Sequence, residues 1–130
     1  APYAEGLVDV RVATNAEADR VIQEILGLKA SLPGASVEIT GGLNRPPMEK
    51  TPATAQLLDT ARNLARPLGI ELIEAHVGGG SDGQFAAAVG APVLDGLGGV
   101  GEGPHADHEH VIVSALPERV GLLASLLAGE

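Results

Sequence analysis

The stretch that decides the fold is IELIEAHVGGGSDGQFAAAVG, residues 70–90. It joins a strand-like apolar run, Ile70 to Val77, to a short helix-like run through a turn that contains Gly78–Gly80. A strand, a tight turn and a helix in this order are typical of a parallel sheet that is covered by helices. We therefore expect an α/β domain around this turn, with a short helix that starts at Ser81 or Asp82.

The segments on both sides of this turn continue the alternation of helices and strands. Upstream, Thr51 caps a predicted helix that Pro52 opens and Gly69 ends. Downstream, residues 92–94 favour another strand, and residues 111–115 favour an extended or irregular segment. The last predicted helix, residues 117–128, is expected to turn these side chains inward: Leu116, Val120, Leu123, Ala124 and Leu127.

The first part of the chain has a separate β-α-β pattern. Residues 7–14 alternate between apolar and polar side chains, which predicts a half-buried strand. Thr14 and Glu17 form a capping box before an amphipathic helix, and residues 37–39 predict a second strand. Because composition and rhythm change near residue 50, we expect two pieces of larger domains, residues 1–50 and 51–130.

Composition excludes several classes of function. The 130 residues include 17 acidic and 8 basic ones, for a net charge of −9, and no cysteine. Such a chain has no basic surface for nucleic acid or for anionic membranes, and no apolar run is long enough to span a bilayer. We expect neither partner, and we expect a cytoplasmic protein, with the periplasm not excluded.

The glycine turn matches two further patterns. Gly78, Gly80 and Gly83 fit a dinucleotide fingerprint, but Asp82 would place a carboxylate where the pyrophosphate should lie. The turn also fits the nucleophile elbow of serine hydrolases, with Ser81 as the nucleophile and Asp95 and a later histidine as its partners. A serine hydrolase therefore remains an alternative function.

A cluster of potential metal ligands follows within the next 30 residues. Imidazole and carboxylate groups are the ligands that zinc or manganese binds. Their spacing gives no closed set of four ligands, so the cluster could donate one ligand to a site that is completed elsewhere. It consists of His105, Asp107, His108, Glu109 and His110.

Four motifs together resemble a family of zinc-dependent exopeptidases and deacylases, which includes glutamate carboxypeptidase, acetylornithine deacetylase and succinyl-diaminopimelate desuccinylase. The resemblance covers nearly the whole chain and implies the end of a β-α-β lid (dimerisation) domain, followed by the C-terminal part of a mostly parallel α/β zinc-hydrolase domain. The motifs are a lid strand at residues 8–12, a loop at 41–48, a turn at 79–82, and Gly101–His105 with Glu109.

The resemblance also implies a mechanism and a set of site residues. Water activated between two zinc ions attacks an amide carbonyl next to a free carboxylate, in a small peptide or an N-acyl amino acid. His105 matches the last zinc ligand, and Arg45 matches an arginine that holds the substrate carboxylate. The other implied positions are Asn44, His76, Gly79 and Gly80 at the substrate, and Asp82 and Glu109 beside the metal site. His76 stands where glutamate carboxypeptidase relatives carry an arginine.

The resemblance places the other zinc ligands and the general base before the point that corresponds to Ala1. We therefore expect this chain to be the C-terminal portion of such an enzyme, inactive on its own, and paired either with the missing N-terminal segment or as a homodimer. The alternative of a different class is a noncatalytic binding or assembly module that kept the scaffold and one histidine.

Overall fold

The structure is a computed structural model that describes residues 2–129, so that Ala1 and Glu130, the outer ends of the two expected domains, lie outside the described residues. The chain divides into two compact units, one made of Ala1–Glu49 with Gly78–Val89 and the other of Lys50–Val77 with Gly90–Glu130. Helices and a short sheet give a mixed α/β class. Since the glycine turn belongs to the first unit, the assignment of residues 1–50 and 51–130 to a lid and a catalytic domain stays a prediction.

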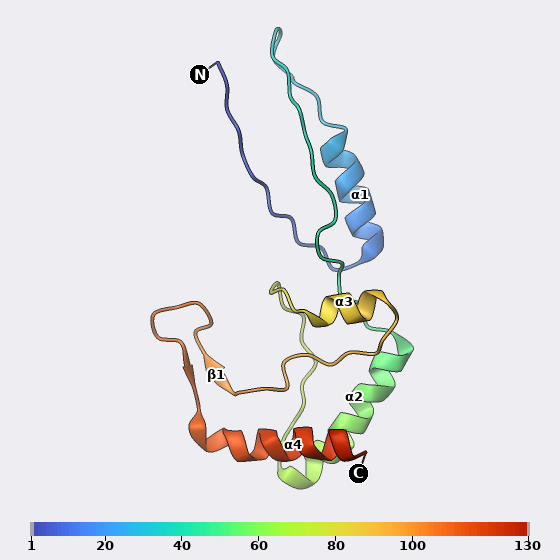
Figure 1. Cartoon of the computed structure of the whole chain (residues 1–130), viewed down its shortest axis with the longest axis vertical. Helices are drawn as coiled ribbons and strands as arrows, with labels where there is room; N and C mark the ends of the chain where they lie inside the picture. Colours follow the sequence, from blue (N-terminus) through green and yellow to red (C-terminus); the bar gives the residue numbers. More distant parts are fainter. Residues whose placement is uncertain (1, 130) are drawn as a thin grey trace. The chain divides into compact units, whose positions relative to one another are not determined.

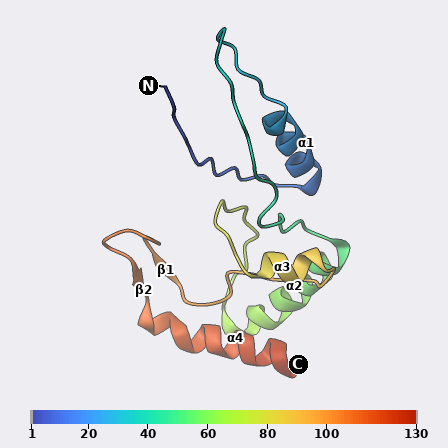
Figure 2. The same cartoon turned by 45° about the horizontal axis from the view of Figure 1, so that its top comes forward.

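The first unit contains the helices α1 (Asn15–Leu26) and α3 (Gly83–Ala88). The predicted cap of α1 is confirmed, because Thr14 Oγ1 accepts the N–H of Glu17 at 3.2 Å. Figures 1 and 2 show the segment after α1 running back alongside the helix. Few side chains are enclosed in this unit, where Ala18 and Pro47 are buried.

The second unit is built on α2 (Pro52–Ala65), the short helix η1 (Arg66–Leu68) and α4 (Leu116–Ala128). The cap and the stop predicted for α2 are confirmed: Thr51 accepts the N–H of Thr54 at 3.1 Å, and Gly69 adopts φ +71° after η1. α4 packs across the end of α2 and against η1 (Figure 1). The small core at this contact consists of Ala61, Ala65 and Leu122.

The predicted inward face of α4 is wrong. Leu122 is fully buried, and Gly121 lies against Leu68, whose Cδ1 would be 3.6 Å from an added Cβ. The side chains that were expected to point inward are exposed instead, with Val120 63% and Leu127 90% exposed. α4 is apolar on more than one side, and a helix of that kind is normally covered all round.

Most of the predicted strands are not paired. Among residues 2–129, the sheet consists of β1 (Gly101–Glu102) and β2 (His110–Val111), which are antiparallel, with Gly101 opposite Val111. The predicted strands at 7–14, 37–39, 70–77 and 92–94 lie in no ladder, and residues 113–115 form the short helix η2 (Val113–Ala115) instead. A strand requires a hydrogen-bonded neighbour, and the described part of the chain supplies none to these segments.

The chain exposes far more surface than a compact protein of its mass. Its accessible surface is 10062 Å². A compact monomer of 13.1 kDa would expose about 6,400 Å², and two separate compact domains of half that mass about 7,700 Å². The excess over two compact domains is roughly 2,400 Å².

The β1–β2 pair leaves no room for a side chain at Gly101. A Cβ there would overlap the carbonyl oxygen of His110 and lie 2.9 Å from its carbonyl carbon. We expect Gly101→Ala to break the pair and to remove the hydrogen-exchange protection of the Ile112 amide, which donates to Val100 O at 2.7 Å. Gly98→Ala, at a position with open space, is the control; wild-type protection of Ile112 in Gly101→Ala would contradict this prediction.

None of the helices between residues 2 and 129 combines the length and the apolar character needed to cross a membrane.

Candidate active site

The loop that carries Arg45 is fixed to the start of α1. Glu49 Oε1 accepts the backbone N–H of Asn15 at 2.6 Å and its side-chain Nδ2 at 2.8 Å. Pro47, between Arg45 and Glu49, is buried, so the loop is anchored on both the polar and the apolar side. This anchoring directs Arg45 toward the glycine turn of the same unit.

Arg45 contacts the glycine turn in three ways. Its Nη1 donates to Asp82 Oδ1 at 2.9 Å, and its Cζ lies 4.7 Å from the centre of the Phe85 ring. Its aliphatic stem passes Gly80, where an added Cβ would lie 3.5 Å from the Arg45 Cδ. A guanidinium placed over an aromatic face gains about 0.5–1 kcal/mol at an exposed site. The turn and Phe85 therefore define the direction in which this cation points.

A second arginine holds the other end of the turn. Arg11 donates from Nη1 to the carbonyl oxygen of Gly78, while its Nε and Nη2 both lie 3.2 Å from Asp9 Oδ2. We did not predict Arg11 or Phe85 from the sequence. Arg11 lies within the strand predicted at residues 7–14, and Phe85 is the one phenylalanine of the chain, directly after the turn.

The glycines of the turn are not required by the packing of this chain. No atom of the described chain lies within 4 Å of a Cβ built at Gly78 or Gly79, and neither residue has a positive φ. The turn therefore has a bare, open backbone at these positions. A ligand or another segment of protein could approach it closely.

Ser81 forms hydrogen bonds within the turn and the first residues of α3. Its Oγ accepts the N–H of Gly83 at 3.1 Å, and its own N–H donates to Gln84 Oε1 at 3.0 Å. A serine nucleophile would also need a histidine beside this hydroxyl group, so the serine hydrolase stays an alternative prediction.

His105 has a strained backbone. Among residues 2–129 it is the sole non-glycine residue with a positive φ, at +67°. The left-handed conformation costs roughly 1–2 kcal/mol for a residue with a Cβ, and such strain is concentrated at functional sites. The loop between β1 and β2 holds this conformation, because Glu109 Oε2 accepts the His105 N–H at 3.3 Å. The His105 side chain is exposed.

The predicted site residues fall into two groups, one in each unit. Asn44, Arg45, Gly79, Gly80 and Asp82 belong to the first unit, and His76, His105 and Glu109 to the second. The structure brings Arg45, Gly80 and Asp82 into contact, and it brings Glu109 to the backbone of His105.

Asn44 and His76 are both exposed. His76 lies near Glu74, whose carboxylate accepts a hydrogen bond from Lys50 Nζ at 2.6 Å. This hydrogen bond, with the positive charges of Lys50 and Arg62, lowers the pKa of Glu74.

The metal ligands present in residues 2–129 do not make a complete site. No group of three or more His, Cys, Asp or Glu side chains in that part of the chain could hold an ion. A zinc site needs at least three protein ligands. The described residues therefore do not supply a complete zinc site, and no reaction step can be derived from them alone.

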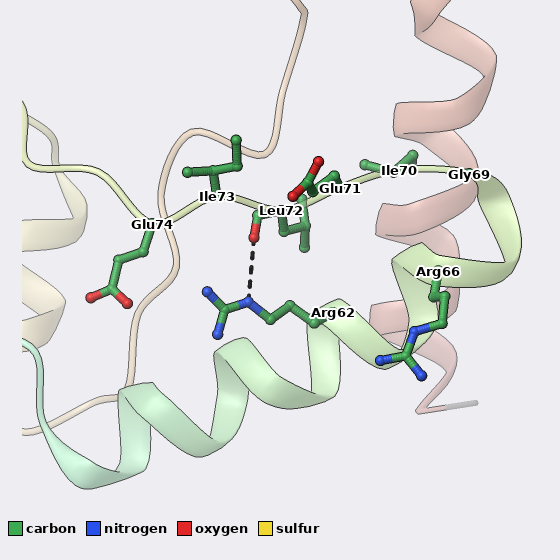
Figure 3. Close-up of a pocket in the computed structure, with 8 residues that line it drawn as sticks. All are labelled: Arg62, Arg66, Gly69, Ile70, Glu71, Leu72, Ile73 and Glu74. Carbon is green, nitrogen blue, oxygen red and sulfur yellow. Dashed lines mark hydrogen bonds between the residues drawn. The ribbon is translucent and has the colours of Figure 1, made fainter.

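A hollow of about 760 Å³ lies beside α2 in the second unit (Figure 3). Arg62 Nε donates across it to the carbonyl oxygen of Leu72 at 3.3 Å. Its wall is the predicted strand at 70–77, so we interpret the hollow as space beside an unpaired strand. It is lined by Arg62, Arg66, Gly69, Ile70, Glu71, Leu72, Ile73 and Glu74.

Comparisons with known proteins bear on the whole chain. The profile of Peptidase family M20/M25/M40 matches residues 2–129. The chain is 34% identical over 123 residues to "Carboxypeptidase G2" of Pseudomonas sp. (strain RS-16). That alignment covers 92% of this chain and 30% of the relative, so the chain spans less than a third of the length of the curated protein it matches. No solved structure matches the chain.

The resemblance drawn from the four motifs is thereby confirmed. The family profile extends over all but the terminal residues, and the identity to the carboxypeptidase covers both units. The chain belongs to peptidase family M20/M25/M40.

Proposed function

We propose that this chain is part of a zinc-dependent carboxypeptidase or deacylase, which hydrolyses an amide bond next to a free carboxylate in a small peptide or an N-acyl amino acid. The observation that carries the proposal is the placement of Arg45 over Phe85 at an open glycine turn. The family membership and the name of the relative support the reaction class.

Arg45 has the properties of a carboxylate-binding residue. Its guanidinium is always charged and planar, and it can form two parallel hydrogen bonds to a carboxylate. The side chain is 36% exposed, so its stem is packed while its head remains accessible. The bare backbone at Gly78 and Gly79 would let the substrate lie next to it.

His105 is proposed as a zinc ligand. Its backbone is held in the left-handed region by the loop between β1 and β2, and Glu109 fixes the N–H next to the imidazole. A zinc ion, when bound, polarises the carbonyl of the scissile amide. We propose that the remaining ligands and the general base belong to other parts of the full-length protein, because residues 2–129 hold no further ligand set.

The same full-length protein is the proposed partner of the uncovered apolar surface. The excess over two compact domains is roughly 2,400 Å², which is within the range of obligate interfaces. A homodimer contact formed by the first unit would cover part of it. We propose that both the rest of the full-length protein and a homodimer contact cover this surface. In the second unit, the rest of the full-length protein would cover the larger part.

Replacement of Arg45 tests the proposed substrate class. In the full-length protein, Arg45→Ala is expected to raise KM about 10- to 100-fold for an N-acyl amino acid with a free carboxylate, because charge-assisted hydrogen bonds contribute about 1.5–3 kcal/mol. The wild type should reject the corresponding carboxamide, and Arg45→Ala should lose this discrimination. Steady-state kinetics with both substrates measure the effect.

Arg20→Ala is the matched control, since Arg20 pairs with Glu17 and Glu24 on the surface of α1. It should leave the KM for the acid and the rejection of the carboxamide unchanged. Equal preference of the wild type for the acid and the carboxamide would refute the proposal. A full-length protein that binds the acid but never hydrolyses it would favour the noncatalytic binding module.

A further inference from the structure

The carboxylate of Asp82 accepts a hydrogen bond from Nη1 of Arg45, which is one of the two nitrogens of the Nη1/Nη2 pair that can bind a ligand carboxylate. We infer that Asp82 is an internal competitor: it holds the guanidinium in the free protein, and a bound carboxylate displaces it. This inference rests on the proposed role of Arg45 and adds a residue that sets the affinity of that site.

The contact between the two residues is suited to exchange. It is a single hydrogen bond, from Arg45 Nη1 to Asp82 Oδ1, and within residues 2–129 the Nε and Nη2 of Arg45 have no hydrogen-bond partner. A ligand carboxylate can accept two parallel hydrogen bonds from a guanidinium. A ligand carboxylate that binds the Nη1/Nη2 pair therefore takes Nη1 from Asp82 and gains a second hydrogen bond, from Nη2, that Asp82 does not make.

Breaking the contact between Asp82 and Arg45 costs little free energy. Its side chain is 94% exposed, so water solvates the released carboxylate without a burial cost. An exposed ion pair contributes at most about 1 kcal/mol, which corresponds to a factor of about five in affinity. The competition therefore tunes binding and does not block it.

The position of Asp82 in the fold gives an independent reason. It is the N-cap residue of α3, where an aspartate usually accepts a backbone N–H of the helix, yet its side chain makes no capping hydrogen bond. Ser81 Oγ accepts the N–H of Gly83 instead. The carboxylate is thus not needed by its own helix and is directed to Arg45.

Phe85 keeps the guanidinium in place during the exchange. Its ring lies 4.7 Å from Arg45 Cζ and is part of α3, so the stacking contact does not depend on Asp82. Phe85 is therefore a positioning residue that acts through Arg45. Its loss should weaken carboxylate binding, while the loss of Asp82 should strengthen it.

The test is competitive inhibition of the full-length protein by glutarate, a dicarboxylate without a scissile bond. Asp82→Asn is expected to lower the inhibition constant of glutarate and the KM of the substrate about two- to fivefold. Phe85→Leu should raise both constants about two- to fivefold, and Phe85→Tyr should restore them. Glu38→Gln removes an exposed carboxylate of the same unit and controls for general charge repulsion.

The outcomes separate this inference from the proposed function. If glutarate binds through Arg45 but Asp82→Asn has the wild-type or a higher inhibition constant, the competition is refuted and the function stands. If Glu38→Gln strengthens binding as much as Asp82→Asn, the competition is also refuted. If glutarate binding is absent, or is unchanged in Arg45→Ala, the proposed role of Arg45 fails and the inference falls with it.

Discussion

His105→Gly in the full-length protein is expected to lower kcat/KM for amide hydrolysis about a thousandfold while leaving the free energy of unfolding within about 1 kcal/mol of the wild type. Activity would be lost because the proposed zinc site, if it polarises the carbonyl, contributes several kcal/mol to the transition state, and about 4 kcal/mol corresponds to a thousandfold rate.

Stability is preserved for a separate reason. His105 has a φ of +67°, a conformation that costs roughly 1–2 kcal/mol with a Cβ and little for glycine. The relief of this strain offsets the roughly 0.5–1 kcal/mol by which glycine favours the unfolded chain. If His105 served packing alone, its replacement would show the opposite pattern: stability would fall and activity would remain.

His108→Ala is the matched control, since His108 lies in the same loop and is not a proposed ligand. It should keep kcat/KM within about threefold of the wild type. Denaturant unfolding and steady-state kinetics give the two quantities. Wild-type activity of His105→Gly would remove His105 from the site.

Val120→Asp is expected to destabilise the full-length protein by about 3 kcal/mol or more and to leave the isolated 130-residue chain unaffected. Val120 is 63% exposed on α4 and lies on an apolar stripe with Leu123 and Leu127. If the remainder of the protein covers this stripe, the substitution buries an unpaired carboxylate and removes apolar contacts. The isolated chain, with 10062 Å² exposed, should also unfold without a sharp cooperative transition.

Glu118→Gln is the control on the same helix, since Glu118 is an exposed polar residue. It should change the free energy of unfolding of the full-length protein by no more than about 0.5 kcal/mol. Equal stabilities of the wild type and Val120→Asp in the full-length protein would show that this side of α4 stays in water.

The helices could be predicted from the sequence because their determinants are local. Thr14 and Thr51 cap α1 and α2, and Gly69 ends the helical run after α2. The strands could be predicted as segments with the right alternation, but not as ladders. Pairing depends on a neighbouring strand that local sequence does not specify, and the pair found within residues 2–129, β1–β2, is closed by the short loop that carries His105.

The candidate site could also be predicted only where its signals are local in the sequence. The turn at 78–83 and the loop at 41–48 were identified by motif, and the structure places Arg45 of that loop against Asp82 of that turn. The partners that orient them, Arg11 and Phe85, were missed because a contact between residues 67 positions apart leaves no local signal. The face of α4 was missed because a helix that is apolar on several sides has no unique inward stripe.

Zinc content measured in the full-length protein tests most directly whether His105 completes a metal site that is shared with the rest of the chain. Inductively coupled plasma mass spectrometry should find less zinc per chain in His105→Gly than in the wild type, whereas the isolated 130-residue chain should retain none after dialysis. Equal zinc in His105→Gly and the wild type, or zinc held firmly by the isolated chain, would contradict the account.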